Sequence, residues 1–468
     1  MEKEQKLVKN ILMYMIANLG AKLLLLIIYP IYTYYVIPYE LGVYDLIIST
    51  LTLLYPIIVF SINDAVFRWL LDNNEKDSLK VIATGLKITF RNIFIFNIIY
   101  IIYNLYFNIE YGWIVLVIIN LGSLYPVFQQ IARGLKKNKI FALSGLLYAV
   151  GLVFFNVIFV ILFRLGVTGL LISQIAAYII PCLFLFLTLE CLHTKWWKVN
   201  VSKEMENNMI KYSLLLIPNS CCWWIMNASD RYLIHFLLGN TMNGIYAISH
   251  KFPSIMNMLT SVFVLAWQEQ AILEYSSEER DLYYSKIHRM YYLFLFSMCL
   301  LLSPITKWFV IFCIQPDYIS AWQYSSTLYL GSIFLALASF LGTGYLNAKN
   351  TKGSMITSML GATVNIIINM GLLPYIGLDA AAISTLLGNM TIWITRWIQV
   401  KKYFTIKMQW GEFIILVVLN VFIGIVIRRT RFITDIIILS ALISITIFLN
   451  YELIKELLKA FRIKKAIK

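Results

Sequence analysis

The sequence predicts an all-α integral membrane protein with 14 transmembrane helices in a 6+6+2 arrangement, in which two parallel, pseudo-symmetric six-helix lobes precede one additional pair. Of its 468 residues, 60% are hydrophobic and only 13% are charged, against about 25% charged residues in an average soluble domain. Long uncharged runs recur along the whole chain, and two short motifs recur at similar spacing. The charged residues are too few to cover the exterior of a soluble fold of this length.

The individual helices follow from the spacing of the charges. A helix needs about 20 apolar residues to cross about 30 Å of hydrocarbon. Runs with no charge, one charge or one charged pair predict helices at 10–37, 41–67, 80–107, 112–133, 140–163, 167–190, 210–238, 242–271, 284–313, 319–347, 353–374, 378–399, 411–428 and 433–453. The first helix follows the charged segment MEKEQKLVK without a small-residue cleavage site, so we expect an uncleaved span rather than a signal peptide.

An internal repeat groups these helices into three parts. Residues 1–200 are predicted to form an N-terminal six-helix lobe, residues 201–408 a C-terminal six-helix lobe, and residues 409–468 two further helices with a basic cytoplasmic tail. Leu41-Gly42-Val43-Tyr44 recurs as Asn243-Gly244-Ile245-Tyr246, and the segment 166–173 recurs as 377–384. Because each repeat holds an even number of helices, both lobes enter the membrane in the same direction, as in transporters that rock two bundles around a central site.

The basic residues orient the helices. Of the 39 Lys and Arg residues, 29 fall in segments that a cytoplasmic N-terminus places inside, 5 fall in outer segments and 5 lie within helices. Basic residues accumulate in cytoplasmic loops, so both termini are predicted to be cytoplasmic. Three of the five outer residues are Arg428, Arg429 and Arg431. The final hairpin is therefore the main departure from the accumulation of basic residues in cytoplasmic loops.

Composition excludes several other functions. The net charge of +15 is spread over short loops between apolar runs, which indicates membrane orientation rather than binding to nucleic acid. The six cysteines lack metal-ligand spacing and the chain has only four histidines, so neither structural zinc, disulfides nor any cofactor is expected. The predicted loops are too short for a soluble catalytic domain, so we do not expect an enzyme. No cluster of acids marks a site for a coupling ion, Na⁺ or H⁺.

Three cations lie deep within predicted helices, where a charge costs about 2.5–3.5 kcal/mol or more. Lys22 lies about 18 Å from the cytoplasmic end of the first helix, and Lys251 about 15 Å from the outer end of the eighth, at 1.5 Å per residue. Arg231 has no acidic partner on its own helix face. These residues are therefore candidates for a substrate site between the lobes.

Other polar residues near these cations have two interpretations each. Asp230 lies at the depth of Lys251 across the turn near Gly239, so the two residues form either an ion pair or part of the ligand site. Asp64 and Arg68 are four residues apart, which favours a pair on the helix surface, although intramembrane charges are often functional.

Five further residues are secondary candidates for lining a cavity. Trp223 and Trp224 precede Arg231 by one to two helical turns and either pack in the core or face the cavity. His250 is interpreted first as a buried core histidine. Asn18 and Asn227 either join helices by hydrogen bonds or contact a ligand. Cations without acidic partners in a hydrated cavity favour an anionic substrate, such as a lipid diphosphate.

Several stretches carry a family resemblance that covers essentially the whole chain. They are Gly42-Val-Tyr44 with Asn63-Asp-Ala-Val-Phe-Arg68, then Ile217-Pro-Asn-Ser220, Trp224-Ile-Met-Asn-Ala-Ser-Asp-Arg-Tyr232, Gly244-Ile-Tyr-Ala-Ile-Ser-His-Lys-Phe-Pro253 and Ala266-Trp-Gln-Glu269. This set resembles bacterial polysaccharide flippases of the Wzx type, which belong to the superfamily of multidrug, oligosaccharidyl-lipid and polysaccharide exporters.

The resemblance implies a function and a location. Such a protein would move undecaprenyl-diphosphate-linked oligosaccharide repeat units from the inner to the outer leaflet of the bacterial cell membrane, by alternating access, for capsule or exopolysaccharide assembly. Lys22, Arg231 and Lys251 match the cavity cations that hold the diphosphate in this family. Candidate protein partners are the polysaccharide polymerase and its assembly machinery. Peptidoglycan-precursor flippases, a sister branch, tend to carry several arginines near the first helix, where this chain has only Lys22. This difference argues against a peptidoglycan precursor as the substrate.

An ion-coupled multidrug exporter of the same superfamily is the alternative function. An exporter of cationic drugs needs net acid in its cavity, whereas the deep charges here are mainly basic. A membrane-embedded glycosyltransferase or polymerase would need catalytic groups in substantial outer loops, which this chain lacks. The sequence alone does not name the sugar.

Overall fold

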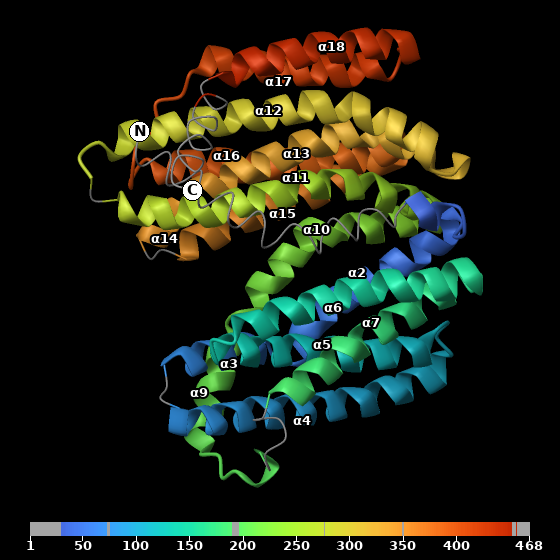
Figure 1. Ribbon diagram of the computed structural model, residues 1–468, viewed down its shortest axis with the longest axis vertical. Helices are drawn as coiled ribbons and strands as arrows, with labels where there is room; N and C mark the ends of the chain where they lie inside the picture. The colour runs from blue at the N-terminus through green and yellow to red at the C-terminus, as the bar shows by residue number, and fades with distance from the viewer. Residues whose placement is uncertain are drawn as a thin grey trace, which may run out of the picture. The chain divides into compact units, whose positions relative to one another are not determined.

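The computed structural model describes residues 30–72, 75–189, 196–275, 277–348 and 351–451, together with residue 455. Throughout these residues the chain forms helices joined by short turns, and no β-strand occurs in this part of the protein. Figure 1 shows long helices running in roughly the same or opposite directions within each half of the chain. The predicted all-α membrane fold is therefore confirmed.

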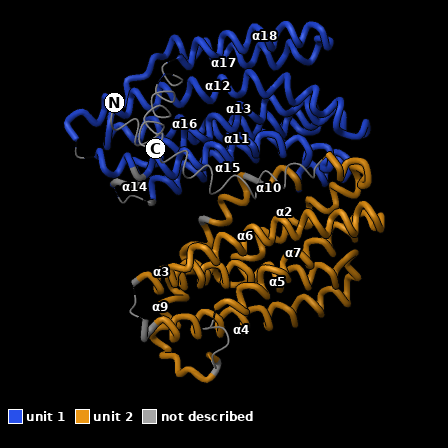
Figure 2. The backbone as a smooth tube through the Cα atoms, viewed as in Figure 1, with its two compact units in different colours: residues 1–22, 232–468 blue, residues 23–231 orange. Residues whose placement is uncertain are grey.

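The chain divides into two compact units, and within the described residues the division falls between residues 231 and 232, inside one helix (Figure 2). In the text, the first unit is residues 23–231, which Figure 2 draws in orange as unit 2, and the second unit is the one drawn in blue as unit 1. The described part of the first unit, residues 30–231, contains α2 (Pro38–Ile58), α3 (Ile62–Asp72), α4 (Glu75–Phe107), α5 (Gly112–Gly134), α6 (Asn138–Asn156), the π-helical segment η1 (Val157–Leu162), α7 (Gly166–Thr188), the short η2 (Trp196–Lys198), α9 (Lys203–Leu214) and most of α10 (Ile217–Leu238). The predicted lobe boundary at residue 200 stays a prediction.

The second unit begins within α10 and includes the C-terminal helices. It contains α11 (Asn240–Leu273), α12 (Arg280–Cys313), the short η3 (Pro316–Tyr318), α13 (Ala321–Leu341), α14 (Thr343–Asn347), α15 (Thr351–Ile376), α16 (Leu378–Val400), α17 (Trp410–Ile427) and α18 (Phe432–Leu449). Within this unit α16 packs against α13 and α15, and α17 and α18 pack against α12.

Ten of the described helices are long and apolar enough to cross a membrane. Three more of the predicted spans correspond to α10, α11 and α16, which are 22, 34 and 23 residues long and are not among these ten. Most of the predicted span 10–37 lies outside the described residues. The protein is thus a multi-pass membrane protein, and the count of 14 spans stays a prediction.

The single helix expected over 41–67 is instead two helices, α2 and α3. Phe60 and Ser61 adopt left-handed backbone conformations, with φ of 55° and 51°. The Ser61 N–H donates to the Pro56 carbonyl at 2.8 Å, and the Phe60 N–H donates to the Ile57 carbonyl at 3.2 Å. This bonding pattern is the Schellman motif, which ends a helix by satisfying its last carbonyl groups. Apolar composition alone did not reveal this break, because the residues on both sides remain hydrophobic.

The two repeat motifs occupy matching places in the two units. Gly42 and Gly244 each follow the first residue of a helix, Pro38 and Asn240, by four positions. The second motif begins in both units with a left-handed glycine, Gly166 with φ of 55° and Gly377 with φ of 59°. An L side chain rarely adopts this conformation, which explains why glycine recurs at the starts of α7 and α16.

Small residues allow close helix packing in the first unit. A Cβ atom added at Gly122 of α5 would overlap the Tyr55 ring of α2, and one added at Gly134 would lie 2.7 Å from the Leu70 side chain of α3. Both glycines are buried. Since the hydrophobic effect does not drive helices together within lipid, close van der Waals packing at small residues is a main source of association.

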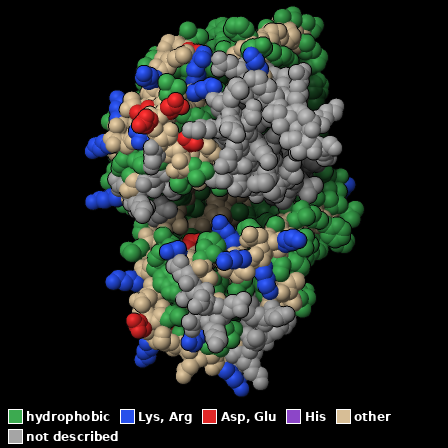
Figure 3. Space-filling view, turned by 60° about the vertical axis from the view of Figure 1, so that its left-hand side comes forward, with side chains coloured by type: hydrophobic (Ala, Val, Ile, Leu, Met, Phe, Trp, Pro, Cys, Tyr) green, Lys and Arg blue, Asp and Glu red, His purple; other side chains and the backbone are tan. Residues whose placement is uncertain are grey.

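Basic side chains are exposed between helices in both units. The segment from the end of α5 to the start of α6 exposes Lys136, Lys137 and Lys139, and the turn after α16 exposes Lys401 and Lys402. Figure 3 shows Lys and Arg side chains spread over one face of the protein. These turns are among the segments predicted to be cytoplasmic.

A buried ion pair joins the final hairpin to α12. The ammonium group of Lys307 donates to the Asp435 carboxylate at 2.7 Å and to the carbonyls of Ile427 and Thr430 at 2.8 and 2.7 Å. Trp308 Nε1 donates to the same carboxylate at 2.9 Å, and the Thr430 hydroxyl also bonds it. The two charged side chains are only 5% and 1% exposed. Lys307, which the orientation count placed in an outer segment, is therefore a buried residue of α12.

A second contact explains one of the exceptional arginines. Arg428 forms a 2.7 Å ion pair with Asp379 in the first turn of α16 and donates to the Gln323 carbonyl at 2.6 Å. The guanidinium thus links the α17–α18 turn to α13 and α16. A structural role therefore accounts for an arginine that departs from the positive-inside rule.

Replacing Lys307 with Met should lower the free energy of unfolding by about 3–5 kcal/mol, because it leaves a charged Asp435 buried without its counter-ion. The double variant Lys307→Met, Asp435→Leu should recover much of that loss, since it removes both charges. Thermal unfolding of the purified protein would measure both effects. Glu206→Gln is the control, because it breaks the more exposed Arg91–Glu206 pair and should cost less than about 1 kcal/mol. Equal losses for Lys307→Met and Glu206→Gln would contradict this role.

Candidate functional site

The predicted site residues fall on several helices. Lys22 and Asn18 lie outside the described residues, and for Asn227 only the backbone, in α10, is described. The other candidates lie on α3 (Asp64, Arg68), α10 (Trp223, Trp224, Asp230, Arg231) and α11 (His250, Lys251). The α3 and α10 candidates belong to the first unit and the α11 candidates to the second.

Arg231 forms an ion pair with Asp45 of α2. Its Nε atom lies 2.6 Å from Asp45 Oδ2, and the two side chains are 14% and 13% exposed. Charge-assisted hydrogen bonds of this length are among the stronger ones in proteins. The sequence predicted that Arg231 has no acidic partner on its own helix face. Its acidic partner, Asp45, lies on another helix and 186 residues earlier in the chain.

A second hydrogen bond fixes the register of α10 against α2. Trp224 Nε1 donates to the Ser49 carbonyl at 2.7 Å. Trp224 precedes Arg231 by seven residues, whereas Ser49 follows Asp45 by four. The two helices therefore run in opposite directions along this contact. Trp224 therefore joins α10 to α2. The neighbouring Trp223 is 40% exposed.

Asp45, the partner of Arg231, is not among the sequence-based candidates. It immediately precedes the uncharged run 46–63, so its position within a membrane helix was visible in the sequence. An acid within α2 and an arginine without a nearby acid in α10 are complementary. Pairing them requires the knowledge that α2 and α10 are neighbours, which one sequence does not supply.

Asp230 lies on α10 and Lys251 on α11, and the two residues differ in burial. Asp230 is buried, with 2% exposure. Lys251 is half-buried in α11, and its backbone carbonyl accepts a hydrogen bond from Ser254 at 2.5 Å. The turn between α10 and α11 is centred on Gly239, with φ of 85°, as expected from the sequence. His250 packs edge-on against Tyr246 with ring centroids 4.7 Å apart, a contact typical of a core residue.

The Asp64 region involves a third helix. Arg68 is exposed on α3, whereas Asp64 is half-buried and interacts electrostatically with Arg133 of α5. The Arg133 guanidinium lies 4.3 Å from the centroid of the Phe67 ring, within the range of a cation–π contact. The Phe67–Arg133 contact thus joins α3 to α5, and Asp64 interacts electrostatically with the same arginine.

The arrangement provides charged side chains within the helices of this fold. The charged candidates that the structure describes lie on α3, α10 and α11. In the part of the chain that the structure describes, no three His, Cys, Asp or Glu side chains are grouped as metal ligands. The charges can hold and release an anion, with acids such as Asp45 as alternative partners for the cations.

Comparison with known families gives one match. A family model described as "Polysaccharide biosynthesis protein" matches residues 7–268, more than half of the chain. No curated protein matches the sequence at a significant level.

Solved structures show the same fold. A structure titled "Lipid II flippase MurJ, inward closed conformation" has a TM-score of 0.72 at 15% identity and covers 95% of this chain and 100% of its own. A mutant form of the MATE transporter VcmN of Vibrio cholerae has a TM-score of 0.58 at 12% identity, covering 86% of this chain and 98% of its own. A MOP superfamily transporter from Pyrococcus furiosus has a TM-score of 0.57 at 15% identity and covers 85% and 95%.

Asp45→Asn and Arg231→Gln should each destabilise the first unit, because each leaves a partly buried charge without its partner. A double-mutant cycle on the free energy of unfolding should give a coupling of about 2 kcal/mol, as for a hydrogen bond to a charged group. Lys211→Gln is the control, since this lysine is exposed on α9 and its change should stay within about 0.5 kcal/mol. Strict additivity of the two single variants would show that the pair does not couple α2 to α10.

Proposed function

Because the chain belongs to the polysaccharide biosynthesis protein family, we propose that it translocates undecaprenyl-diphosphate-linked oligosaccharide repeat units from the inner to the outer leaflet of the bacterial plasma membrane. The product would supply assembly of capsule or exopolysaccharide, with the polymerase and assembly machinery as protein partners. Both termini would lie in the cytoplasm. The protein would act as a transporter and would make or break no covalent bond.

The observation that carries this proposal is the set of basic side chains within membrane helices of a chain from this family. Arg231 is paired with Asp45 in the first unit, and half-buried Lys251 lies on α11 in the second. Lys22 is the third candidate. A diphosphate cannot enter hydrocarbon without counter-charge, and Lys and Arg supply it as a point charge and a bidentate fork respectively.

The Asp45–Arg231 pair would take part in substrate exchange. When a diphosphate enters, its oxygens compete with the Asp45 carboxylate for the Arg231 guanidinium. The pair neutralises the arginine when no substrate is bound, and the diphosphate neutralises it when substrate is present. Inward-to-outward alternation of the lobes would then carry the headgroup across the bilayer. The inside-negative potential favours outward movement of an anion by about 2.3 kcal/mol per charge per 100 mV.

An ion-coupled multidrug exporter is the second candidate, supported by the likeness to MATE structures with TM-scores of 0.56 to 0.58. The likeness to the MurJ structure is greater and covers more of the chain, and MurJ is titled a lipid II flippase. The basic character of the candidate residues also suits an anionic lipid headgroup better than a cationic drug. Na⁺ and H⁺ remain the candidate coupling ions.

Deleting the gene in the native host should cause lipid-linked oligosaccharide to accumulate in the inner leaflet. The wild-type gene should relieve the accumulation, whereas Lys251→Gln and Lys22→Gln should restore less than about a tenth of transport, because each removes a charge–phosphate contact of about 1.5–3 kcal/mol. Lys251→Arg should retain more activity because it keeps the positive charge. Leaflet-specific labelling of the glycolipid measures each result.

Lys402→Gln is the matched control, because this lysine is exposed in the turn after α16 and should leave transport unchanged. Full rescue by Lys251→Gln and Lys22→Gln would still support the flippase function, but it would show that these two lysines are not part of the substrate site. Unchanged glycolipid in the deletion strain, combined with new sensitivity to cationic drugs, would favour the exporter.

A further inference from the structure

A cluster of three lysines occupies the turn between α5 and α6. Lys136, Lys137 and Lys139 are all exposed. Within the part of the chain that the structure describes, none of these three side chains forms a hydrogen bond or an ion pair. No Asp or Glu occurs in the sequence between Glu110 and Glu190, so α5, α6 and α7 supply no acid to balance them. The turn therefore presents three positive charges to its surroundings.

The local backbone does not favour lysine at these positions. Lys136 has a left-handed φ of 58°, and its N–H donates to the Arg133 carbonyl at 3.0 Å. The Lys137 N–H donates to the Ala132 carbonyl at 2.9 Å. These bonds form a Schellman motif, in which the left-handed residue is usually glycine, and a side chain in this conformation costs free energy.

The start of α6 opposes positive charge as well. Lys137 is the N-cap residue of α6 and makes no capping hydrogen bond, and Lys139 lies in the first turn. The dipole of a helix disfavours cations at its N-terminus and favours anions there. The stability of the turn therefore does not explain why lysine occupies these positions. An anion outside the protein would explain them.

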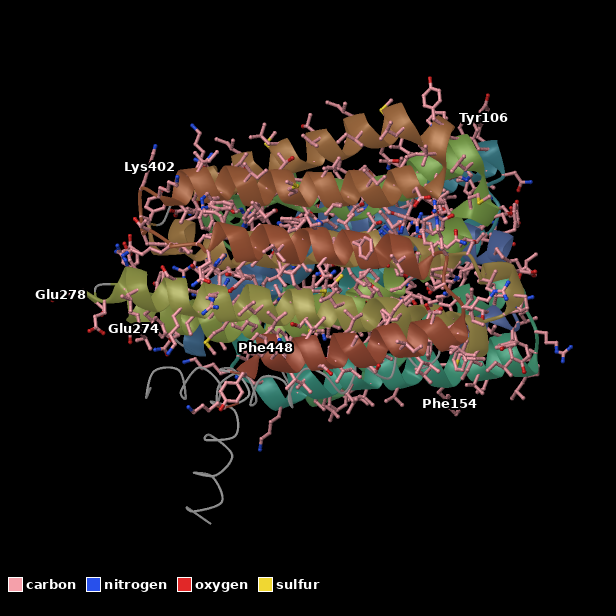
Figure 4. All side chains as sticks on the ribbon, turned by 90° about the horizontal axis from the view of Figure 1, so that it is seen from above. Tyr106, Phe154, Glu274, Glu278, Lys402 and Phe448 are labelled. Atoms are coloured by element: carbon pink, nitrogen blue, oxygen red, sulfur yellow. The ribbon has the colours of Figure 1, made fainter. Side chains whose placement is uncertain are left out.

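The cluster continues into a side of α6 that is suited to contact with lipid. Leu143, Leu146 and Val150 follow Lys139 by 4, 7 and 11 residues, so they share its helix face. They are 44%, 40% and 46% exposed, as expected for apolar side chains that meet lipid tails. Phe154 on the same face is 57% exposed, and Figure 4 shows it pointing outward from the helices.

Lys139 thus lies about 6 Å beyond Leu143 along the helix axis, where the apolar face ends. A cation at this border meets lipid headgroups. Arg133, exposed at the end of α5, is a fourth basic residue in this segment, although Asp64 interacts with it. The segment is among those predicted to be cytoplasmic, and groups of four or more Lys and Arg residues directly cytoplasmic of a membrane helix bind anionic lipids.

We propose that the α5–α6 turn binds the headgroup of an anionic phospholipid of the phosphatidylglycerol type. Its phosphate would lie at Lys139, with Lys136 and Lys137 adding to the positive potential, and an acyl chain would extend along Leu143 and Leu146. This lipid is distinct from the transported glycolipid, and its binding depends on the membrane fold rather than on the substrate. The contact would hold this end of the first unit at the membrane surface.

Photo-crosslinking in vesicles tests this assignment. The full-length protein carrying p-benzoylphenylalanine in place of Leu143 would be reconstituted in phosphatidylethanolamine with a minor fraction of phosphatidylglycerol, irradiated and analysed by mass spectrometry. The ratio of phosphatidylglycerol to phosphatidylethanolamine in the adducts should exceed the bulk ratio at least about five-fold, the factor that one lysine at a membrane surface supplies. High salt should lower this enrichment, because it screens exposed charges.

Charge variants identify the lysines as the cause. The triple variant Lys136→Gln, Lys137→Gln, Lys139→Gln should return the adducts to the bulk ratio, whereas changing the same three residues to Arg should keep the enrichment. The matched control is the triple variant Lys198→Gln, Lys203→Gln, Lys211→Gln, which removes three other exposed lysines of the same unit. This control should preserve the enrichment, although its net charge changes equally.

A second crosslinker position tests the depth of the site. In place of Phe154, about 22 Å from Lys139 along α6, the crosslinker should capture lipids at the bulk ratio. A bulk ratio at Leu143, equal enrichment at Phe154, or enrichment that survives the triple Gln variant of the turn would overturn the proposal. A crosslink from Leu143 to protein in place of lipid would also overturn it. Because the vesicles contain no glycolipid, none of these results depends on the proposed flippase function.

Discussion

The structure depends on the neutralisation of charge within helices that lipid surrounds. Lys307 and Asp435 illustrate the requirement, because the three N–H groups of the lysine meet three oxygen acceptors and both side chains are almost fully buried. Without water, a lone charge at this position would be severely unfavourable. The pair therefore specifies where α18 packs, and the arrangement of α12, α17 and α18 follows from it. Arg231 and Asp45 meet the same requirement between α10 and α2.

The helices could be predicted from the sequence because their signal is local. Runs of apolar residues bounded by charges place most helix ends within a few residues of those observed, as for α5 and α16. The left-handed glycines at 166 and 377 likewise mark matching helix starts. The break between α2 and α3 could not be predicted, since it depends on the backbone conformation of Phe60 and Ser61 rather than on apolar character. Both residues carry side chains for which that conformation is uncommon.

The candidate site could be predicted only in part, because its partners are distant in the sequence. Arg231 was recognisable as a charge in the wrong environment, but Asp45 lies 186 residues away. Lys307 likewise finds Asp435 across 128 residues, and it was interpreted as a residue of an outer segment. Sequence alone identifies charges that need partners, whereas helix packing decides which partners they receive. The two resulting ion pairs have the same chemistry and differ in their surroundings.

Under the proposed function, that difference distinguishes a structural pair from one that would exchange partners with a substrate. The Lys307 and Asp435 side chains are 5% and 1% exposed, whereas those of Arg231 and Asp45 are 14% and 13% exposed. Opening a pair costs more as its surroundings become drier, because each separated charge loses solvation as well as its partner. Under the proposed function, the greater exposure of Arg231 and Asp45 would lower that cost, and an incoming phosphate would replace the carboxylate while the arginine stays neutralised. Lys307 offers no comparable route, since its acceptors include two backbone carbonyls that cannot leave without unfolding the turn between α17 and α18.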